Sequence, residues 1–175
     1  YEEQSTKDRS KLINYFMENK LKNLMEHLSE FWMKIGVAEF LENVSKLKKK
    51  EEKIAALRHN DSVVIRMVLQ GAFDPAVKWA LPDGIPPYKP NDLTDQEHVF
   101  IREHRKIPYF IEGAFPGLHR IKRETMFIEL LEQVAPKDAE MLVAIKEKRL
   151  PYKGLTKDIV VEAFPDLIPN EQAKI

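Results

Sequence analysis

The sequence contains no cysteine and no long apolar run. The absence of Cys among 175 residues excludes a disulfide framework, a thiolate zinc site and a cysteine nucleophile. No stretch of about 18 apolar residues occurs, so we expect no membrane-spanning helix. Lys and Arg together number 28, as do Asp and Glu, so the formal net charge is zero. Non-specific nucleic-acid binding depends on neutralising phosphates, so a chain with no net charge is not expected to coat nucleic acid with its whole surface. Local basic patches could still bind it.

Motifs of common enzymes and metal proteins are also missing. There is no GxSxG motif, no phosphate-binding P-loop and no GxGxxG motif. The five histidines are scattered, and none has the spacing of a metal site. We therefore predict no catalytic residues, no metal and no cofactor. An unrecognised enzyme is the weakest of the alternatives.

Apolar residues recur with helical spacing along most of the chain, and no convincing strand pattern of alternating residues occurs. This periodicity predicts an all-α domain over residues 36–168, followed by a short tail, 169–175. Pro108 is expected to interrupt or kink one of the helices. The helices are expected at 37–47, 51–59, 62–72, 95–112, 120–134, 136–149 and 156–164.

The segment 73–95 cannot form one regular element, because it contains five prolines and a glycine. It is long for a loop in a compact domain. Its aromatic and apolar residues indicate that it packs along the helices. We therefore expect an ordered, irregular crossing with Trp79 largely buried. A proline-rich ligand for another domain is the less favoured alternative.

Residues 9–35 form a strong amphipathic pattern, and Gly36 is expected to end this helix. Residues 1–35 are therefore predicted to form a helical arm. The arm either packs on its own domain or docks on another protein or a second copy. We favour a partner or a second copy, because Gly36 separates the arm from a domain with enough apolar faces to close its own core. Six large apolar residues share one seam with the spacing 4-3-4-3-4: Met17, Leu21, Leu24, Leu28, Phe31 and Ile35.

A basic turn, centred on Gly154, follows the helix expected at 136–149. Cations there can hold phosphates, through their charge and through free N–H groups at the next helix start. The alternative is a solvated turn with a helix-terminating glycine. The charge run 46–53 is interpreted as a solvated connection. The five cations of the turn, with only Glu147 and Asp158 among them, are Lys146, Lys148, Arg149, Lys153 and Lys157.

The order of these landmarks resembles the helical N-terminal DNA-binding domain of ATP-dependent DNA ligases, especially the compact form in T-even-type phages. FLENVSKLKKKEEKIAALRHND (40–61) is similar to its opening helix pair. DPAVKWALPDGIPP (74–87) resembles the crossing segment of the phage ligases, and MLVAIKEKRLPYKGLTKDIVVEAFPDLI (141–168) resembles the closing pattern that faces the DNA backbone. The whole chain also resembles an uncharacterised family of small T-even-like phage proteins.

The resemblance implies a module that holds the minor-groove side of a duplex through backbone contacts, without reading sequence. At the matching positions, the phosphate contacts would be Arg149, Lys153, Gly154 and Lys157. Two further candidates without a firm counterpart in the family are Lys122 and Arg123.

The resemblance does not extend to ligase chemistry. A ligase needs a lysine nucleophile in a KxDG motif, but Leu81 stands two positions before Asp83-Gly84. Too few residues follow for the adenylation and OB domains. The expected function is therefore a non-catalytic phage accessory protein that binds duplex DNA in replication, repair or transcription, in the cytoplasm of the host cell. The alternative is a protein-interaction or virion component without DNA binding.

Overall fold

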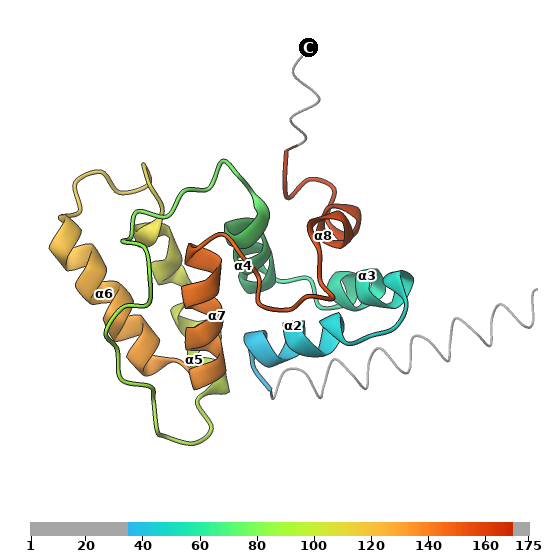
Figure 1. Cartoon of the computed structure of the whole chain (residues 1–175), viewed down its shortest axis with the longest axis horizontal. Helices are drawn as coiled ribbons and strands as arrows, with labels where there is room; N and C mark the ends of the chain where they lie inside the picture. The colour runs from blue at the N-terminus through green and yellow to red at the C-terminus, as the bar shows by residue number, and fades with distance from the viewer. Residues whose placement is uncertain (1–34, 170–175) are drawn as a thin grey trace, which may run out of the picture. The chain divides into compact units, whose positions relative to one another are not determined.

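Seven α-helices and one 3-10 helix form in residues 35–169, the part of the chain that this computed structural model describes (Figure 1). Within those residues no strand forms, and an isolated bridge joins Trp79 to Ile111. The all-α prediction is confirmed for this part of the chain. Of the predicted arm seam, only Ile35 lies in it. The elements are α2 Val37–Ser45, α3 Lys50–His59, α4 Val63–Phe73, α5 Glu97–Glu103, η1 His104–Phe110, α6 Arg120–Gln133, α7 Pro136–Lys146 and α8 Lys157–Ala163.

The helix α7 lies at the centre of the domain and packs against α2, α4 and α6. Five consecutive residues of α7, 141–145, are buried and apolar. A helix that is apolar all round must be covered on every side, and each large side chain so buried contributes about 1.5–3 kcal/mol. In Figure 1, α5 and α6 lie at one end of the domain, α3 and α8 lie at the other, and α4 lies between them.

One predicted helix is divided in the structure. In place of a helix over 95–112, α5 ends at Glu103 and the 3-10 helix η1 continues to Phe110, with Pro108 inside it. Proline lacks an N–H, and its ring collides with the carbonyl four residues earlier, so regular α-helical bonding stops before it. The prediction that Pro108 interrupts the helix is confirmed, although the change of geometry begins four residues earlier.

The helix α7 ends three residues before its predicted end, in a Schellman motif. The Lys148 N–H donates to the carbonyl of Ile145 at 2.9 Å, and the Arg149 N–H donates to the carbonyl of Ala144 at 3.2 Å. Lys148 takes the left-handed position with φ of 59°, where glycine is usual. The sequence therefore places a strained lysine at the start of the basic turn.

The segment 74–95 takes the irregular path that its prolines predict. The indole N–H of Trp79 donates to the carbonyl of Gly71 on α4 at 3.0 Å. Most of Trp79 is covered, at intermediate exposure, so the expectation that it is largely buried is confirmed. The indole lies directly against the helix backbone, where a Cβ on Gly71 would stand 2.8 Å from Cζ2 of the ring.

The second half of this segment is bonded to α6 and α7. The Gly84 N–H donates to the carboxylate of Glu147 at 2.7 Å, just beyond the end of α7. The Lys89 N–H donates to the carboxylate of Glu132 on α6 at 3.0 Å. These bonds hold the residues between them, including Tyr88, against the two helices. The crossing segment thereby supplies side chains to one face of α7.

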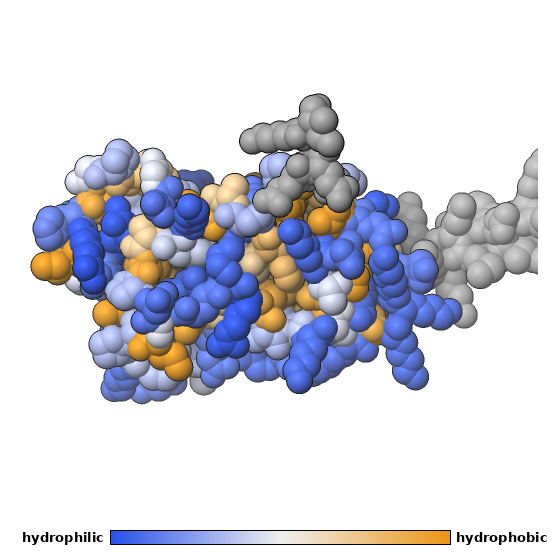
Figure 2. Space-filling model, turned by 45° about the horizontal axis from the view of Figure 1, so that its top comes forward, coloured by the Kyte–Doolittle hydropathy of each residue, from blue (hydrophilic) through white to orange (hydrophobic). Residues whose placement is uncertain are grey.

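Exposed apolar side chains are spread over several elements in the described part of the chain. Figure 2 shows one face, on which apolar areas are separated by hydrophilic side chains. Isolated apolar residues on a surface are ordinary and need no partner. Ile85 is the most exposed of them, at 80%, and lies in the crossing segment. The large exposed apolar residues are Val63, Ile85, Leu93, Ile101, Phe115 and Ile121.

Candidate functional site

The cations of the predicted basic turn differ in their availability. Lys146 is buried, and its ammonium donates to the carbonyl of Pro82 at 2.9 Å and pairs with the Glu147 carboxylate. The hydrogen bond from Lys146 and then the N–H of Gly84 hold the pKa of Glu147 below its usual value. Lys146 therefore anchors the crossing segment, and its charge is neutralised within the domain.

Lys148 binds the last turn of α4 and the chain just after it. Its ammonium donates to the carbonyls of Gly71, Asp74 and Val77 at 2.8, 2.6 and 2.9 Å. An ammonium has three N–H groups, so these bonds use all of them. Burial lowers the pKa of Lys148. This side chain compensates for the strained backbone at Lys148 and has no donor left for a phosphate.

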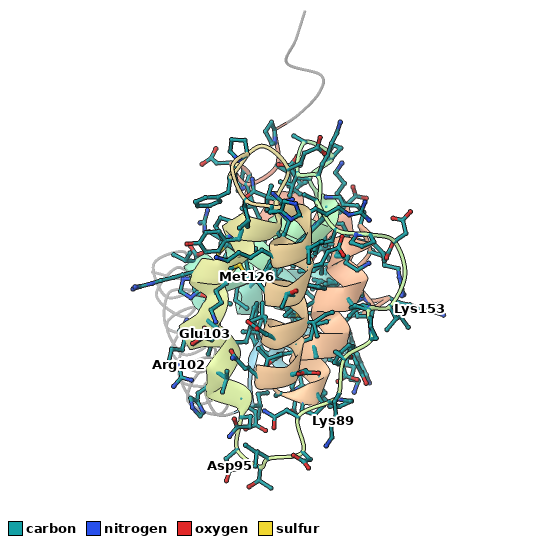
Figure 3. All side chains as sticks on the ribbon, turned by 90° about the vertical axis from the view of Figure 1, so that its left-hand side faces the viewer. Lys89, Asp95, Arg102, Glu103, Met126 and Lys153 are labelled. Carbon is teal, nitrogen blue, oxygen red and sulfur yellow. The ribbon has the colours of Figure 1, made fainter. Side chains whose placement is uncertain are left out.

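The other three cations of the turn are free of internal partners. Arg149, Lys153 and Lys157 are exposed, and their side chains form no ion pair or hydrogen bond with the residues that the structure describes. Figure 3 shows Lys153 projecting outward at the edge of the domain. These three side chains can therefore meet an external anion without breaking an internal contact.

Gly154 joins the basic turn to the end of α2. A Cβ at this position would stand 2.0 Å from the carbonyl oxygen of Ser45, so only glycine permits this approach. The ammonium of Lys53 donates to the Gly154 carbonyl at 2.6 Å. The interpretation of Gly154 as a helix-terminating glycine does not apply, because α7 ends at Lys146. The glycine is needed where two distant segments touch.

This contact places the charge run 46–53 beside the turn. Lys46 and Lys50 are paired with Glu42 and Glu162, at 3.3 and 2.6 Å. Lys48 is exposed, as is its neighbour Lys49, and neither forms an ion pair within the described residues. Five exposed cations without ion pairs thus lie in the two segments that meet where Gly154 contacts Ser45. We call them the basic surface: Lys48, Lys49, Arg149, Lys153 and Lys157.

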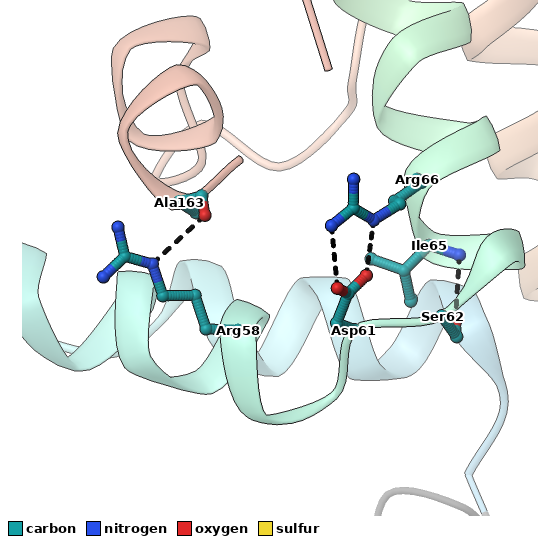
Figure 4. Close-up of polar contacts among 6 residues, drawn as sticks. All are labelled: Arg58, Asp61, Ser62, Ile65, Arg66 and Ala163. Carbon is teal, nitrogen blue, oxygen red and sulfur yellow. Dashed lines mark hydrogen bonds and ion pairs between the residues drawn. The ribbon is translucent and has the colours of Figure 1, made fainter. Parts of the chain in front are cut away.

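The helix that follows the turn, α8, is held by Arg58 on α3 (Figure 4) and, just past its end, by Arg66 on α4. Arg58 at the end of α3 donates through Nε to the carbonyl of Ala163 at 3.1 Å. Arg66 on α4 forms a bidentate pair with Asp61, at 2.6 and 2.8 Å, and its guanidinium carbon lies 4.8 Å from the ring centroid of Phe164. These contacts hold α8, and with it the far end of the basic turn.

The two remaining predicted cations lie elsewhere. Lys122 and Arg123 are on α6, at the opposite end of the domain from α8 (Figure 1). Lys122 is exposed. Arg123 donates to the carbonyls of Tyr109, Phe115 and Leu118 at 3.0, 3.3 and 3.2 Å, so it closes the loop before α6. The structure therefore does not bring these two residues together with the basic surface.

A groove of about 370 Å³ opens where α7, the crossing segment and the basic turn meet. Its apolar wall includes Met141, Ala144 and Ile85. Its polar groups are the hydroxyls of Tyr88 and Tyr152, the guanidinium of Arg149, the ammonium of Lys137 and the carboxylates of Glu42 and Glu140. Sequence reasoning missed this groove, because its walls come from four separate segments.

The two tyrosines of the groove keep their protons at neutral pH. Burial, and then the nearby carboxylate of Glu140, raise the pKa of Tyr88. Burial is also the main cause that raises the pKa of Tyr152, followed by the carboxylates of Asp138, Glu42 and Glu140. Neither hydroxyl forms a hydrogen bond with another described residue. Both remain available as donors to a ligand.

In residues 35–169 no group of three or more His, Cys, Asp or Glu side chains is placed to hold a metal ion. No helix in the same range is long and apolar enough to cross a bilayer.

The model of a family of unknown function, DUF6433, matches residues 40–152. The chain belongs to this family. The region matched to DUF6433 contains every residue that lines the groove and ends just before Lys153. No curated protein and no solved structure shows a significant match to the chain. Because the description of DUF6433 gives no activity, the function is argued from the basic surface and the groove.

Proposed function

We propose that this chain is a non-catalytic DNA-binding accessory protein of a phage, which holds the duplex backbone without reading sequence. The observation that carries the proposal is the basic surface, whose five exposed cations have no ion pair among the described residues. The resemblance to the ligase DNA-binding domain also supports it, because Arg149, Lys153 and Lys157 lie in the segment similar to that domain's closing pattern.

Charge distribution favours binding through one face. The formal net charge is zero, and exposed carboxylates such as Glu51 and Asp158 lie in the same segments as the basic surface. Its five cations have no ion pair among the described residues, so they can approach phosphates directly. Lysine presents a compact charge rather than a planar fork and suits phosphates better than base edges. We therefore expect salt-dependent binding that varies little with sequence.

Charge reversal on the turn tests this proposal. Arg149→Glu combined with Lys153→Glu is expected to abolish duplex binding at moderate salt, because two attractive contacts become repulsive. For the parent chain, the logarithm of the binding constant should fall linearly with the logarithm of salt concentration. The slope is about −0.9 for each phosphate contact. The measurement is fluorescence anisotropy of a labelled 20-base-pair duplex over a salt series.

The matched control reverses an Arg and a Lys away from the basic surface. Arg105 and Lys122 are both exposed and form no ion pair within residues 35–169. Arg105→Glu with Lys122→Glu makes the same change in net charge and should retain most of the affinity. Equal loss in both double variants would mean that only net charge matters. That result, or no binding by the parent chain at low salt, would overturn the proposal.

The predicted arm carries a second candidate function, which is assembly with another protein or a second copy. Its seam lies outside the described residues, apart from Ile35. Leu24→Glu with Leu28→Glu is expected to lower the mass measured by light scattering for the parent chain or its complex, while the domain still unfolds cooperatively. A monomeric parent chain whose variant simply unfolds would show instead that the arm belongs to the core.

A further inference from the structure

We infer that the groove beside the basic surface receives one unpaired nucleotide of the bound DNA. The base would lie against the tyrosine-lined wall, and its phosphate would lie at Arg149. This inference rests on the proposed function and assigns a specific DNA structure to it. The groove and the basic surface share Arg149, and Tyr152 in the groove wall directly precedes Lys153. A strand held by the surface would therefore pass the mouth of the groove.

The walls of the groove suit a flat, uncharged ring. Tyr88 from the crossing segment and Tyr152 from the turn both line the groove and are both partly exposed. Ile85, which is 80% exposed, stands at the same groove and would be covered by a bound base. Aromatic side chains stack on any base, which gives affinity without sequence readout. This agrees with binding that does not read sequence.

The polar groups of the groove match the edge of a base. The hydroxyls of Tyr88 and Tyr152 are protonated donors without a partner in the described residues. The carboxylate of Glu140 forms no ion pair there and can accept from an exocyclic amino group. Carboxylates inside the groove would repel a bare anion, which places the phosphate outside, at Arg149. Lys137 is paired with Glu42, which leaves Arg149 as the cation of the groove without an ion pair in the described residues, and the combination of π faces, donors, acceptors and this cation fits a nucleotide.

The nucleotide must be unpaired. A paired base is stacked on both faces inside the duplex and cannot reach the tyrosines without leaving the stack. The cost of leaving the stack is least for a base that has no partner. A duplex with one bulged nucleotide supplies such a base next to a continuous backbone for the basic surface. We therefore expect the protein to prefer bulged over fully paired duplex.

Two duplexes that differ only in one bulged adenine test this inference. The parent chain should bind the bulged duplex about tenfold more tightly than the paired one, as measured by anisotropy. Tyr88→Leu should remove this preference and leave affinity for the paired duplex unchanged. Tyr88→Phe, which keeps the ring, should retain most of the preference. Phe115→Leu changes an exposed aromatic residue outside the groove and should have no effect.

The outcomes separate the inference from the proposed function. Equal affinity of the parent chain for both duplexes, or a preference that survives in Tyr88→Leu, would overturn the inference and leave backbone binding intact. No binding to either duplex or to single strands would overturn both. Saturable binding of dAMP alone, without preference for the bulged duplex, would show a site for free nucleotides and also overturn the inference. A cooperative thermal transition in Tyr88→Leu confirms that the variant is folded.

Discussion

Gly154→Ala is expected to lower the free energy of unfolding by about 3 kcal/mol, at the upper end of the usual cost of overpacking. The new Cβ would stand 2.0 Å from the oxygen and 2.9 Å from the carbon of the Ser45 carbonyl. Both partners are backbone, so no side-chain rotation relieves the collision. At roughly 2–4 °C per kcal/mol, the melting temperature should fall by about 10 °C, which circular dichroism can measure.

Gly117→Ala is the matched control for this substitution. A Cβ on Gly117 would have no neighbour within 4 Å, and its φ lies outside the left-handed region. Alanine there should leave the melting temperature unchanged or raise the stability by up to about 1 kcal/mol, because the unfolded chain loses freedom. Equal melting temperatures for the two variants would contradict the close approach at Gly154.

The same substitution should also affect DNA binding. Separating Gly154 from Ser45 removes the bond from Lys53 and moves Lys48 and Lys49 away from Arg149 and the turn. Duplex affinity should therefore fall even at temperatures where Gly154→Ala is folded. The contact between Gly154 and Ser45 is thus expected both to stabilise the fold and to keep the cations of the basic surface together.

Most of the fold could be predicted from helical periodicity, because the apolar faces of these helices are local patterns. The division of the helix over 95–112 has a local cause, Pro108, but the predicted end of α7 failed where distant contacts decide the backbone. Lys148 keeps a left-handed conformation, and three carbonyls from the end of α4 and the chain after it bind its ammonium. No local pattern in the sequence predicts that these distant carbonyls stabilise the left-handed backbone of Lys148.

The candidate site was only partly predictable for the same reason. The sequence identifies the cations of the turn, but not that Lys146 and Lys148 are bound to carbonyls or that Arg123 closes a loop. It treats 46–53 as a solvated run, because the contact that brings this run to the turn spans 101 positions. The apolar and aromatic residues among the prolines of 73–95 gave the one available signal for the groove wall.

Asp138 is a buried carboxyl that sequence reasoning also missed. It is 2% exposed, and one oxygen accepts the N–H of Ala38 at 2.9 Å. It thereby caps α2, whose own N-cap, Gly36, has no side chain to do so. The other oxygen has no partner among the described residues. Burial raises the pKa of Asp138 to about 7, against the bond from Ala38, and the carboxylates of Glu97 and Glu39 raise it further.

This pKa predicts that stability falls as pH rises from about 4 to about 7. The ordinary value of the carboxyl pKa is 3.8, so between about pH 4 and pH 7 the folded state holds a proton that the unfolded state has released. The stabilisation is complete below about pH 4 and is lost as pH approaches 7. At about 1.4 kcal/mol per pKa unit, the loss has an upper limit of roughly 4 kcal/mol.

Asp138→Asn is expected to remove this pH dependence. The amide oxygen can still accept the N–H of Ala38, and the side chain never ionises. The advantage of the variant over the parent chain should therefore grow by about 2 kcal/mol between pH 5 and pH 8. Urea unfolding at the two pH values measures the difference. Asp158→Asn alters an exposed carboxyl and should leave the pH dependence unchanged. If Asp138→Asn loses as much stability between pH 5 and pH 8 as the parent chain does, Asp138 is not the group that titrates.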